Sequence, residues 1–140
     1  LSYNSTSNPI KKKPKRYYVS SHNSQKILIE QGRCYLAGMN PPRKSKPGKH
    51  RPVVVIQSSD TLQMGSPGVV IVPLTTQLND ENVLRMRLSP SEELKIEKPS
   101  DVLLDQIHTI DRSLLLRDLG PLKSIDFEKI EQGVQFLLGF

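Results

Sequence analysis

Two short runs of β-branched residues constrain the fold of this 140-residue chain more than any other feature. Residues 52–57 (PVVVIQ) and 68–74 (GVVIVPL) each have the length and composition of one buried strand. The segment between them contains Gly65 and Pro67, which favour a loop, and it is short enough for the two strands to pair as a hairpin. Strands this apolar must be buried in a sheet, so the sequence predicts a mainly β core.

Further strands are predicted on both sides of this hairpin. Residues 34–39 are expected to form the first core strand, in which Cys34 and Tyr35 alternate, so that one of the two faces the core. Residues 82–88 alternate apolar and polar side chains with the period of a half-exposed strand. Residues 101–107 are predicted to be one more strand, and residues 118–121 a turn.

The last segment of the chain has the spacing of a helix instead. Its apolar residues recur every three or four positions, at Phe127, Ile130, Val134, Leu137 and Leu138. Ser124 is expected to be the N-cap of this helix, and Gly139 suits its C-terminal end. Short strands followed by one amphipathic helix predict a mainly β, α+β fold, in which the helix covers an antiparallel sheet or a small barrel.

Charge divides the chain into two parts. Of its 20 basic residues, six lie in residues 1–26, namely Lys11, Lys12, Lys13, Lys15, Arg16 and Lys26. That segment has no acidic residue, so residues 27–140 hold the other 14 basic residues and all 14 acidic ones. The segment is also polar at its start, with too few apolar residues to build a core. We therefore expect a basic, disordered extension over residues 1–26 and one folded domain over residues 27–140.

A second concentration of positive charge lies inside the domain. Residues 40–50 are rich in proline and charged residues, which predicts an extended loop. The basic residues in and directly after this loop are Arg43, Lys44, Lys46, Lys49 and Arg51. No acidic residue separates them, so the loop is expected to attract a phosphate backbone.

Composition argues against several classes of protein. No apolar run approaches the roughly 20 residues of a membrane-spanning helix, and no signal peptide is recognisable, so no membrane association is expected. The single cysteine, Cys34, cannot form an internal disulfide and suits a reducing cytoplasm. One cysteine and three scattered histidines do not form a zinc-binding pattern, and no metal or cofactor is expected.

Four motifs in the domain occur in an order that is typical of one family. They are GRCYL from Gly32, RPVVVIQ from Arg51, VIVPLTTQ from Val70 and DQIHTID from Asp105. Together with the helix that ends in LG, they cover residues 31–139 and resemble the MazF/PemK family of toxin endoribonucleases. Each motif alone is weak, but four in this order and spacing are specific.

The resemblance implies both a fold and an activity. It implies an SH3-like small antiparallel β-barrel of the MazF/PemK/CcdB type, which forms a homodimer and is inhibited by a cognate antitoxin protein. The implied reaction is metal-independent cleavage of single-stranded RNA at short sequence motifs, with a 2′,3′-cyclic phosphate and a 5′-hydroxyl as products. The expected location is the cytoplasm.

The resemblance also assigns roles to individual residues. Arg51 is expected to bridge two phosphate oxygens through its planar guanidinium group, and Thr75 to donate a hydroxyl hydrogen bond to the same phosphate. Asp105 matches a position with acid–base or binding roles, although a carboxylate held by a turn explains it equally well. Further RNA contacts are expected from Arg43, Lys44, Lys46, Lys49, Thr76, Gln77 and His108. For Thr76 and Gln77 the alternative is that they only complete the strand end.

The chain departs from the family pattern at two positions. Lys46 lies where many members carry an acidic residue, and His108 lies where the family commonly has arginine. His50 and His108 are candidates for the missing proton transfer, since imidazole titrates close to neutral pH. Either acid–base work has moved to histidine, or the chain is a catalytically impaired member that binds RNA or antitoxin. A third alternative is a CcdB-like toxin that acts on gyrase by protein contact through its C-terminal helix.

Overall fold

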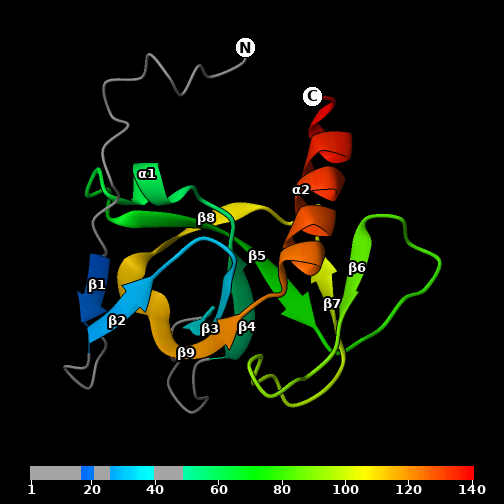
Figure 1. Cartoon of the computed structure of the whole chain (residues 1–140), viewed down its shortest axis with the longest axis horizontal. Helices are drawn as coiled ribbons and strands as arrows, with labels where there is room; N and C mark the ends of the chain where they lie inside the picture. The colour runs from blue at the N-terminus through cyan, green and yellow to red at the C-terminus, as the bar shows by residue number, and fades with distance from the viewer. Residues whose placement is uncertain (1–16, 21–25, 40–48) are drawn as a thin grey trace.

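A computed structural model describes residues 17–20, 26–39 and 49–140 of the chain. In this part, nearly all strands join one antiparallel sheet, and a single long helix packs beside it (Figure 1). The strands are β1 (Tyr17–Ser20), β2 (Lys26–Ile29), β3 (Arg33–Gly38), β4 (His50–Val55), β5 (Gly68–Thr75), β6 (Arg85–Leu88), β7 (Ser100–Leu103), β8 (His108–Asp111) and β9 (Leu115–Pro121). The helices are α1 (Ser59–Leu62), the 3-10 turn η1 (Arg112–Leu114) and α2 (Ser124–Leu138).

Strand β5 organises the sheet. The strands lie side by side in the order β6-β7-β5-β4-β3-β9, and β8 also pairs with β5. The predicted hairpin is confirmed, because β4 and β5 are antiparallel with Val53 opposite Pro73 and Val55 opposite Ile71. The other edge of β5 is shared by two strands, since its first half pairs with β8 and its last two residues pair with β7.

The predicted α+β class is confirmed, but the sheet is not a closed barrel. Among the described strands, β6 and β9 end the pairing order and do not pair with each other. The loop between β6 and β7 lies against β9 instead, where the Lys95 amide donates a 2.7 Å hydrogen bond to the Leu119 carbonyl. The loop makes this hydrogen bond but does not pair along β9 as a strand would. The sheet therefore stays open.

Both faces of the central strands are buried. Cys34 and Tyr35 are each fully inaccessible to solvent, which corrects the expectation that only one of them faces a core. Tyr35 belongs to a cluster with Val53 and Ile71, whereas Cys34 belongs to a second cluster with residues of α2 such as Ile130. The Tyr35 hydroxyl is also fixed, because it donates to the Leu28 carbonyl at 2.6 Å. The sheet is therefore a layer between two cores.

Two predicted strands are shorter than expected. Within residues 82–88 only β6 is extended, because the Asn82 side chain accepts a hydrogen bond from the Leu84 amide and stabilises a turn. The predicted strand over residues 101–107 ends at Leu103, where the Gln106 amide donates to the Leu103 carbonyl at 3.0 Å and the chain turns before β8. The shortening matters because it puts Asp105 in a turn.

Residues 118–121 are not a turn, although Asp118 and Pro121 suggested one. They continue β9, which pairs with β3, and irregularities in the register accommodate the Gly120 backbone. The Asp118 carboxylate accepts from the Gly120 amide at 2.8 Å and pairs with Arg33 at 3.1 Å. Pairing with a neighbouring strand thus overrides the local turn preference.

Helix α2 covers the second core. Its N-cap is Lys123 and not Ser124 as predicted, and no side chain caps its first turn. Gly139 ends the helix with a φ of 79°, as expected from its sequence position. Gly133 lies against Leu104, where an added Cβ would approach the Leu104 Cδ1 to 2.4 Å, so the glycine lets the helix pack closely. No helix in residues 17–20, 26–39 or 49–140 is long and apolar enough to cross a membrane.

The predicted N-terminal extension is described only in part. Residues 17–20 form β1, which pairs antiparallel with β2, so Tyr17 lies opposite Ile29. This short stretch is a strand and not disordered as expected. Residues 1–16 and 21–25 lie outside the described residues, and the boundary between extension and domain stays a prediction.

Close contact between β9 and the β6–β7 loop depends on one glycine. Gly120 has a φ of +104°, and a Cβ built on it would lie 1.8 Å from the Glu93 carbonyl oxygen. Because the obstructing atom belongs to the backbone, it cannot move aside as a flexible side chain does. Gly120 therefore sets the approach of the loop to the sheet.

We predict that Gly120→Ala lowers the free energy of unfolding by more than about 4 kcal/mol, since it adds a backbone clash to an unfavourable φ. Gly65→Ala is the matched control, because Gly65 has a φ of +81° but nothing within 4 Å of an added Cβ. The control is expected to cost about 1 kcal/mol. Urea denaturation measures both values, and equal losses would contradict the role of the loop contact.

Candidate active site

A pocket of about 330 Å³ opens where β4 begins and β5 ends. Its lining residues are Lys49, His50, Arg51, Pro52, Leu74, Thr75, Thr76, Gln77 and Ser100. This lining contains all the described residues that were predicted for the site from the RPVVVIQ and VIVPLTTQ motifs. It also contains those predicted from the loop before Arg51. The antiparallel register explains this, because the start of β4 lies beside the end of β5.

The strand pairing holds Arg51 firmly at its backbone. Arg51 is opposite Ala37 of β3, and Pro52 is opposite Leu36. Ala37 is fully buried, whereas Arg51 is partly exposed, so the backbone is anchored while the guanidinium group can reach the pocket. His50 precedes it and is exposed at the pocket mouth. This arrangement places a guanidinium group and an imidazole ring at one strand end.

The Thr75 hydroxyl has a structural contact and a free donor function. Its oxygen accepts a 3.2 Å hydrogen bond from the Gln77 amide, which closes a small turn directly after β5. A hydroxyl has one proton to donate besides its two acceptor sites. The turn therefore orients Thr75 without using the proton that a phosphate oxygen would accept. Thr76 and Gln77 follow in the same turn and are exposed.

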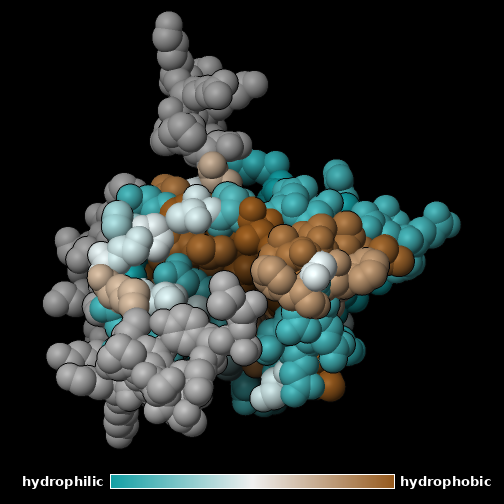
Figure 2. Space-filling model, turned by 90° about the horizontal axis from the view of Figure 1, so that it is seen from above, coloured by the Kyte–Doolittle hydropathy of each residue, from teal (hydrophilic) through white to brown (hydrophobic). Residues whose placement is uncertain are grey.

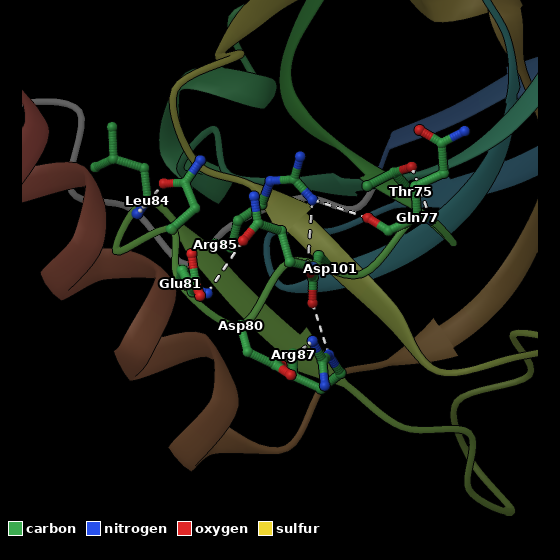
Figure 3. A network of polar contacts seen from close by, with 10 residues as sticks. Thr75, Gln77, Asp80, Glu81, Leu84, Arg85, Arg87 and Asp101 are labelled. Carbon is green, nitrogen blue, oxygen red and sulfur yellow. Dashed lines mark hydrogen bonds and ion pairs between the residues drawn. The ribbon is translucent and has the colours of Figure 1, made fainter.

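A buried carboxylate stands behind this turn, and sequence analysis did not detect it. Asp101 is 1% exposed and lies opposite Thr75 in the pairing of β5 with β7. Its Oδ1 accepts from Arg87 Nε at 2.7 Å, and its Oδ2 accepts from the Asn79 amide at 2.8 Å and from Arg85 Nη1 at 3.3 Å (Figure 3). Burial alone would raise the pKa of Asp101, but the Arg87 and Asn79 hydrogen bonds outweigh it and hold the pKa below its ordinary value.

The same network fixes the loop that follows Thr75. Arg85 Nη1 also donates to the Gln77 carbonyl at 3.0 Å, and Arg87 Nη2 pairs with Asp80 Oδ1 at 2.7 Å (Figure 3). Three successive parts of the loop, at Gln77, Asn79 and Asp80, are thus tied to one carboxylate and its two arginines. The alternation of Arg85 and Arg87 on one face of β6 was visible in the sequence, but their partner was not.

Two predicted site residues lie elsewhere. Asp105 is exposed in the turn after β7, and His108 is exposed at the start of β8. The His108 ring is 2.8 Å from the Gln106 carbonyl oxygen, and its backbone is opposite Ile71, four residues before Thr75. Neither residue lines the pocket. Arg43, Lys44 and Lys46 lie outside the described residues.

The described residues that line this pocket include no cysteine and no group of metal-ligating side chains. Cys34 is buried in the second core, and burial raises the pKa of its thiol to about 12. Within residues 17–20, 26–39 and 49–140, no three side chains of histidine, cysteine, aspartate or glutamate are grouped as metal ligands. The polar side chains that line the pocket carry a guanidinium, an ammonium, an imidazole, a carboxamide and hydroxyl groups.

We predict that Asp101→Asn destabilises the fold by about 2 kcal/mol at neutral pH, because two guanidinium groups lose their shared counter-charge. The folded pKa of Asp101 is below the unfolded value of about 3.9, so its contribution is complete above that value and disappears as the pH falls through the folded pKa. Urea unfolding between acid and neutral pH measures this difference, which is expected to vanish at the acid end.

Asp118→Asn is the matched control for this prediction. Asp118 also pairs with an arginine, but its side chain is 35% exposed, so the loss is expected to stay below about 1 kcal/mol. Equal losses in the two variants, or a loss for Asp101→Asn that does not depend on pH, would contradict the assigned role.

Comparison with known proteins agrees with the motifs. The model of a family described as PemK-like, MazF-like toxins of type II toxin–antitoxin systems matches residues 30–138. An endoribonuclease MazF of Staphylococcus saprophyticus is 30% identical over 112 residues, which are 80% of this chain and 92% of that protein.

Solved structures show the same fold. MazF from Deinococcus radiodurans superimposes with a TM-score of 0.63 at 18% identity and covers 81% of this chain and 99% of its own. A mycobacterial endoribonuclease in complex with its cognate antitoxin gives a TM-score of 0.64 at 20% identity, over 80% of this chain and 96% of its own. The predicted resemblance is confirmed, and the chain belongs to the PemK/MazF family of toxins of type II toxin–antitoxin systems.

Proposed function

We propose that this chain is an endoribonuclease that cleaves single-stranded RNA, with the pocket between β4 and β5 as its active site. The observation that supports this most strongly is that Arg51 and Thr75, which belong to separate motifs, line one pocket. The Staphylococcus saprophyticus relative is named an endoribonuclease, and the alignment spans nearly its whole length.

The proposed reaction is an attack of the ribose 2′-hydroxyl on the neighbouring phosphorus atom. The bond from phosphorus to the 5′-oxygen breaks, which leaves a 2′,3′-cyclic phosphate and a 5′-hydroxyl. The transition state carries extra negative charge on the phosphate oxygens. Arg51 would bind two of these oxygens through its planar fork, and the Thr75 hydroxyl would donate to one of them. Lys49, at the rim of the pocket, would add positive charge.

Proton transfer is assigned to His50. The imidazole of His50 would accept the proton that the 2′-hydroxyl loses, and a water molecule would supply the proton that the 5′-oxygen gains. His50 is exposed at the pocket mouth, directly before Arg51. Asp105 does not line this pocket, so we assign the proton transfer to His50 and not to Asp105. The proposed reaction is metal-independent, with side chains supplying the charge stabilisation and the general base.

We further propose that a cognate antitoxin and a second copy of the chain bind to this protein in the cytoplasm. One matched structure is an endoribonuclease with its cognate antitoxin. The C-terminal segment exposes apolar residues, with Phe136 of α2 73% and Phe140 beyond the helix 91% accessible, and Figure 2 shows hydrophobic residues gathered on this side of the molecule. An exposed apolar patch of this kind is typical of a protein–protein interface.

We predict that the purified protein cleaves a long single-stranded RNA in EDTA at one recurring short motif, and that Arg51→Ala lowers the rate by at least about 100-fold. The reason is the loss of the bidentate donor to the transition state. Mapping of 5′ ends and initial rates measure both effects, and Lys129→Ala on the exposed face of α2 is the control. Absence of cleavage, with Arg51→Ala identical to the unaltered protein, would favour the CcdB-like or the impaired alternative.

We also predict that His50→Ala lowers kcat by roughly 100-fold while the affinity for uncleavable RNA changes by less than about threefold. His108→Ala is the matched control, because it removes the other described histidine, which is also exposed but lies away from the pocket. Equal losses of kcat in both variants, or a loss of affinity as large as the loss of rate, would remove His50 from the chemical step.

A further inference from the structure

A second pocket, of about 400 Å³, adjoins the candidate active site below the β6–β7 loop. Both pockets are lined by His50, Pro52, Thr76 and Ser100, so they form one continuous groove. We infer that this second pocket is an RNA subsite, which holds the nucleotide next to the one cleaved and contacts its phosphate. The inference rests on the proposed function and adds to it the path of the substrate.

The second pocket carries a net positive charge. Three basic side chains line it, namely Lys95, Lys98 and Arg117, against one carboxylate, Glu97. The ion pairs among the described residues engage Arg33, Arg85 and Arg87 but none of these three. Basic side chains without an acidic partner keep their full attraction for a phosphate group.

The floor of the second pocket is apolar. Leu36 of β3 and Leu119 of β9 contribute to it together with Ile96 of the loop. Ile96 and Leu119 are 6% and 4% exposed, so they belong to the packed body of the protein and are not mobile surface groups. A nucleotide has an apolar base face and an anionic phosphate, and a pocket with an apolar floor and a cationic rim matches both.

The walls of the subsite are already held in place without a ligand. The Lys95 amide donates to the Leu119 carbonyl at 2.7 Å, and the Ser100 hydroxyl donates to the Lys98 carbonyl at 3.0 Å. The close approach of Gly120 to Glu93 adds a third contact between loop and sheet. A rigid wall lowers the entropy lost on binding.

Two other pockets in the described part of the chain do not suit RNA. One, of about 590 Å³, is lined by Glu92, Glu93 and Asp126 but only by two basic residues, Arg87 and Lys123. The pocket beside α2 has no basic residue in its lining and contains Glu131. Both would repel a phosphate backbone, which leaves the groove from Lys49 to Arg117 as the cationic path.

The test compares two double variants that remove the same charge. Lys95→Gln/Lys98→Gln changes the subsite, and Lys123→Gln/Lys129→Gln changes basic residues outside the groove. The probe is a mixed-sequence 2′-O-methyl RNA of about ten nucleotides, which cannot be cleaved because its 2′-oxygen is blocked. Fluorescence anisotropy at several salt concentrations gives the affinity and its salt dependence.

The subsite variant is expected to bind the probe about tenfold more weakly at low salt, and its salt slope is expected to decrease by about 0.7, the contribution of one single-strand phosphate contact. The control pair is expected to change neither value appreciably. With cleavable RNA, the subsite variant is expected to raise KM and retain kcat. Equal weakening by both pairs, or none by either, would overturn the inference.

The outcome separates this inference from the proposed function. If the unaltered protein cleaves RNA and Arg51→Ala abolishes cleavage, but the subsite variant behaves like its control, only the subsite is refuted. If the protein binds the probe through the second pocket but cleaves no RNA, the proposed activity is refuted, and the pocket is supported only as a binding site for single-stranded RNA. If the probe does not bind even at low salt, both are refuted.

Discussion

One buried carboxylate connects the fold to the site. A charge as inaccessible as that of Asp101 is tolerated only where cations and amide donors surround it, and Arg85, Arg87 and the Asn79 amide supply them. Because the arginines come from β6 and the amide from the loop after β5, one ion-pair network joins three segments. Thr75 lies opposite this carboxylate. The same network therefore holds the strand end that carries Thr75 at the edge of the pocket.

The local distribution of charge makes the groove positive. The residues from 27 to 140 are neutral overall, so no general basic surface attracts RNA. Away from the groove, Arg33, Arg85 and Arg87 are neutralised by aspartates. Along the groove, Lys49, Arg51 and the three basic residues of the second pocket have no such ion pair among the described residues. Local pairing, and not net charge, creates a positive path.

Much of the fold and half of the site followed from local pattern. The hairpin of β4 and β5 was predictable because β-branched runs flank a short loop, and a hairpin brings the start of its first strand to the end of its second. Arg51 and Thr75 had to lie close together for that reason. The turn predicted at residues 118–121 and the N-cap predicted at Ser124 were wrong, because strand pairing and helix packing override weak local preferences.

Residue type and spacing along the chain were enough to predict the strands β3 to β7, the antiparallel pairing of β4 with β5, and the family. Other features that surround the site depend on the tertiary structure. The partners of Asp101, the division of residues 101–107 into β7 and a turn, and the contact of the β6–β7 loop with β9 depend on register between distant segments. Register is set by packing on both faces of the sheet at once, which no single segment encodes.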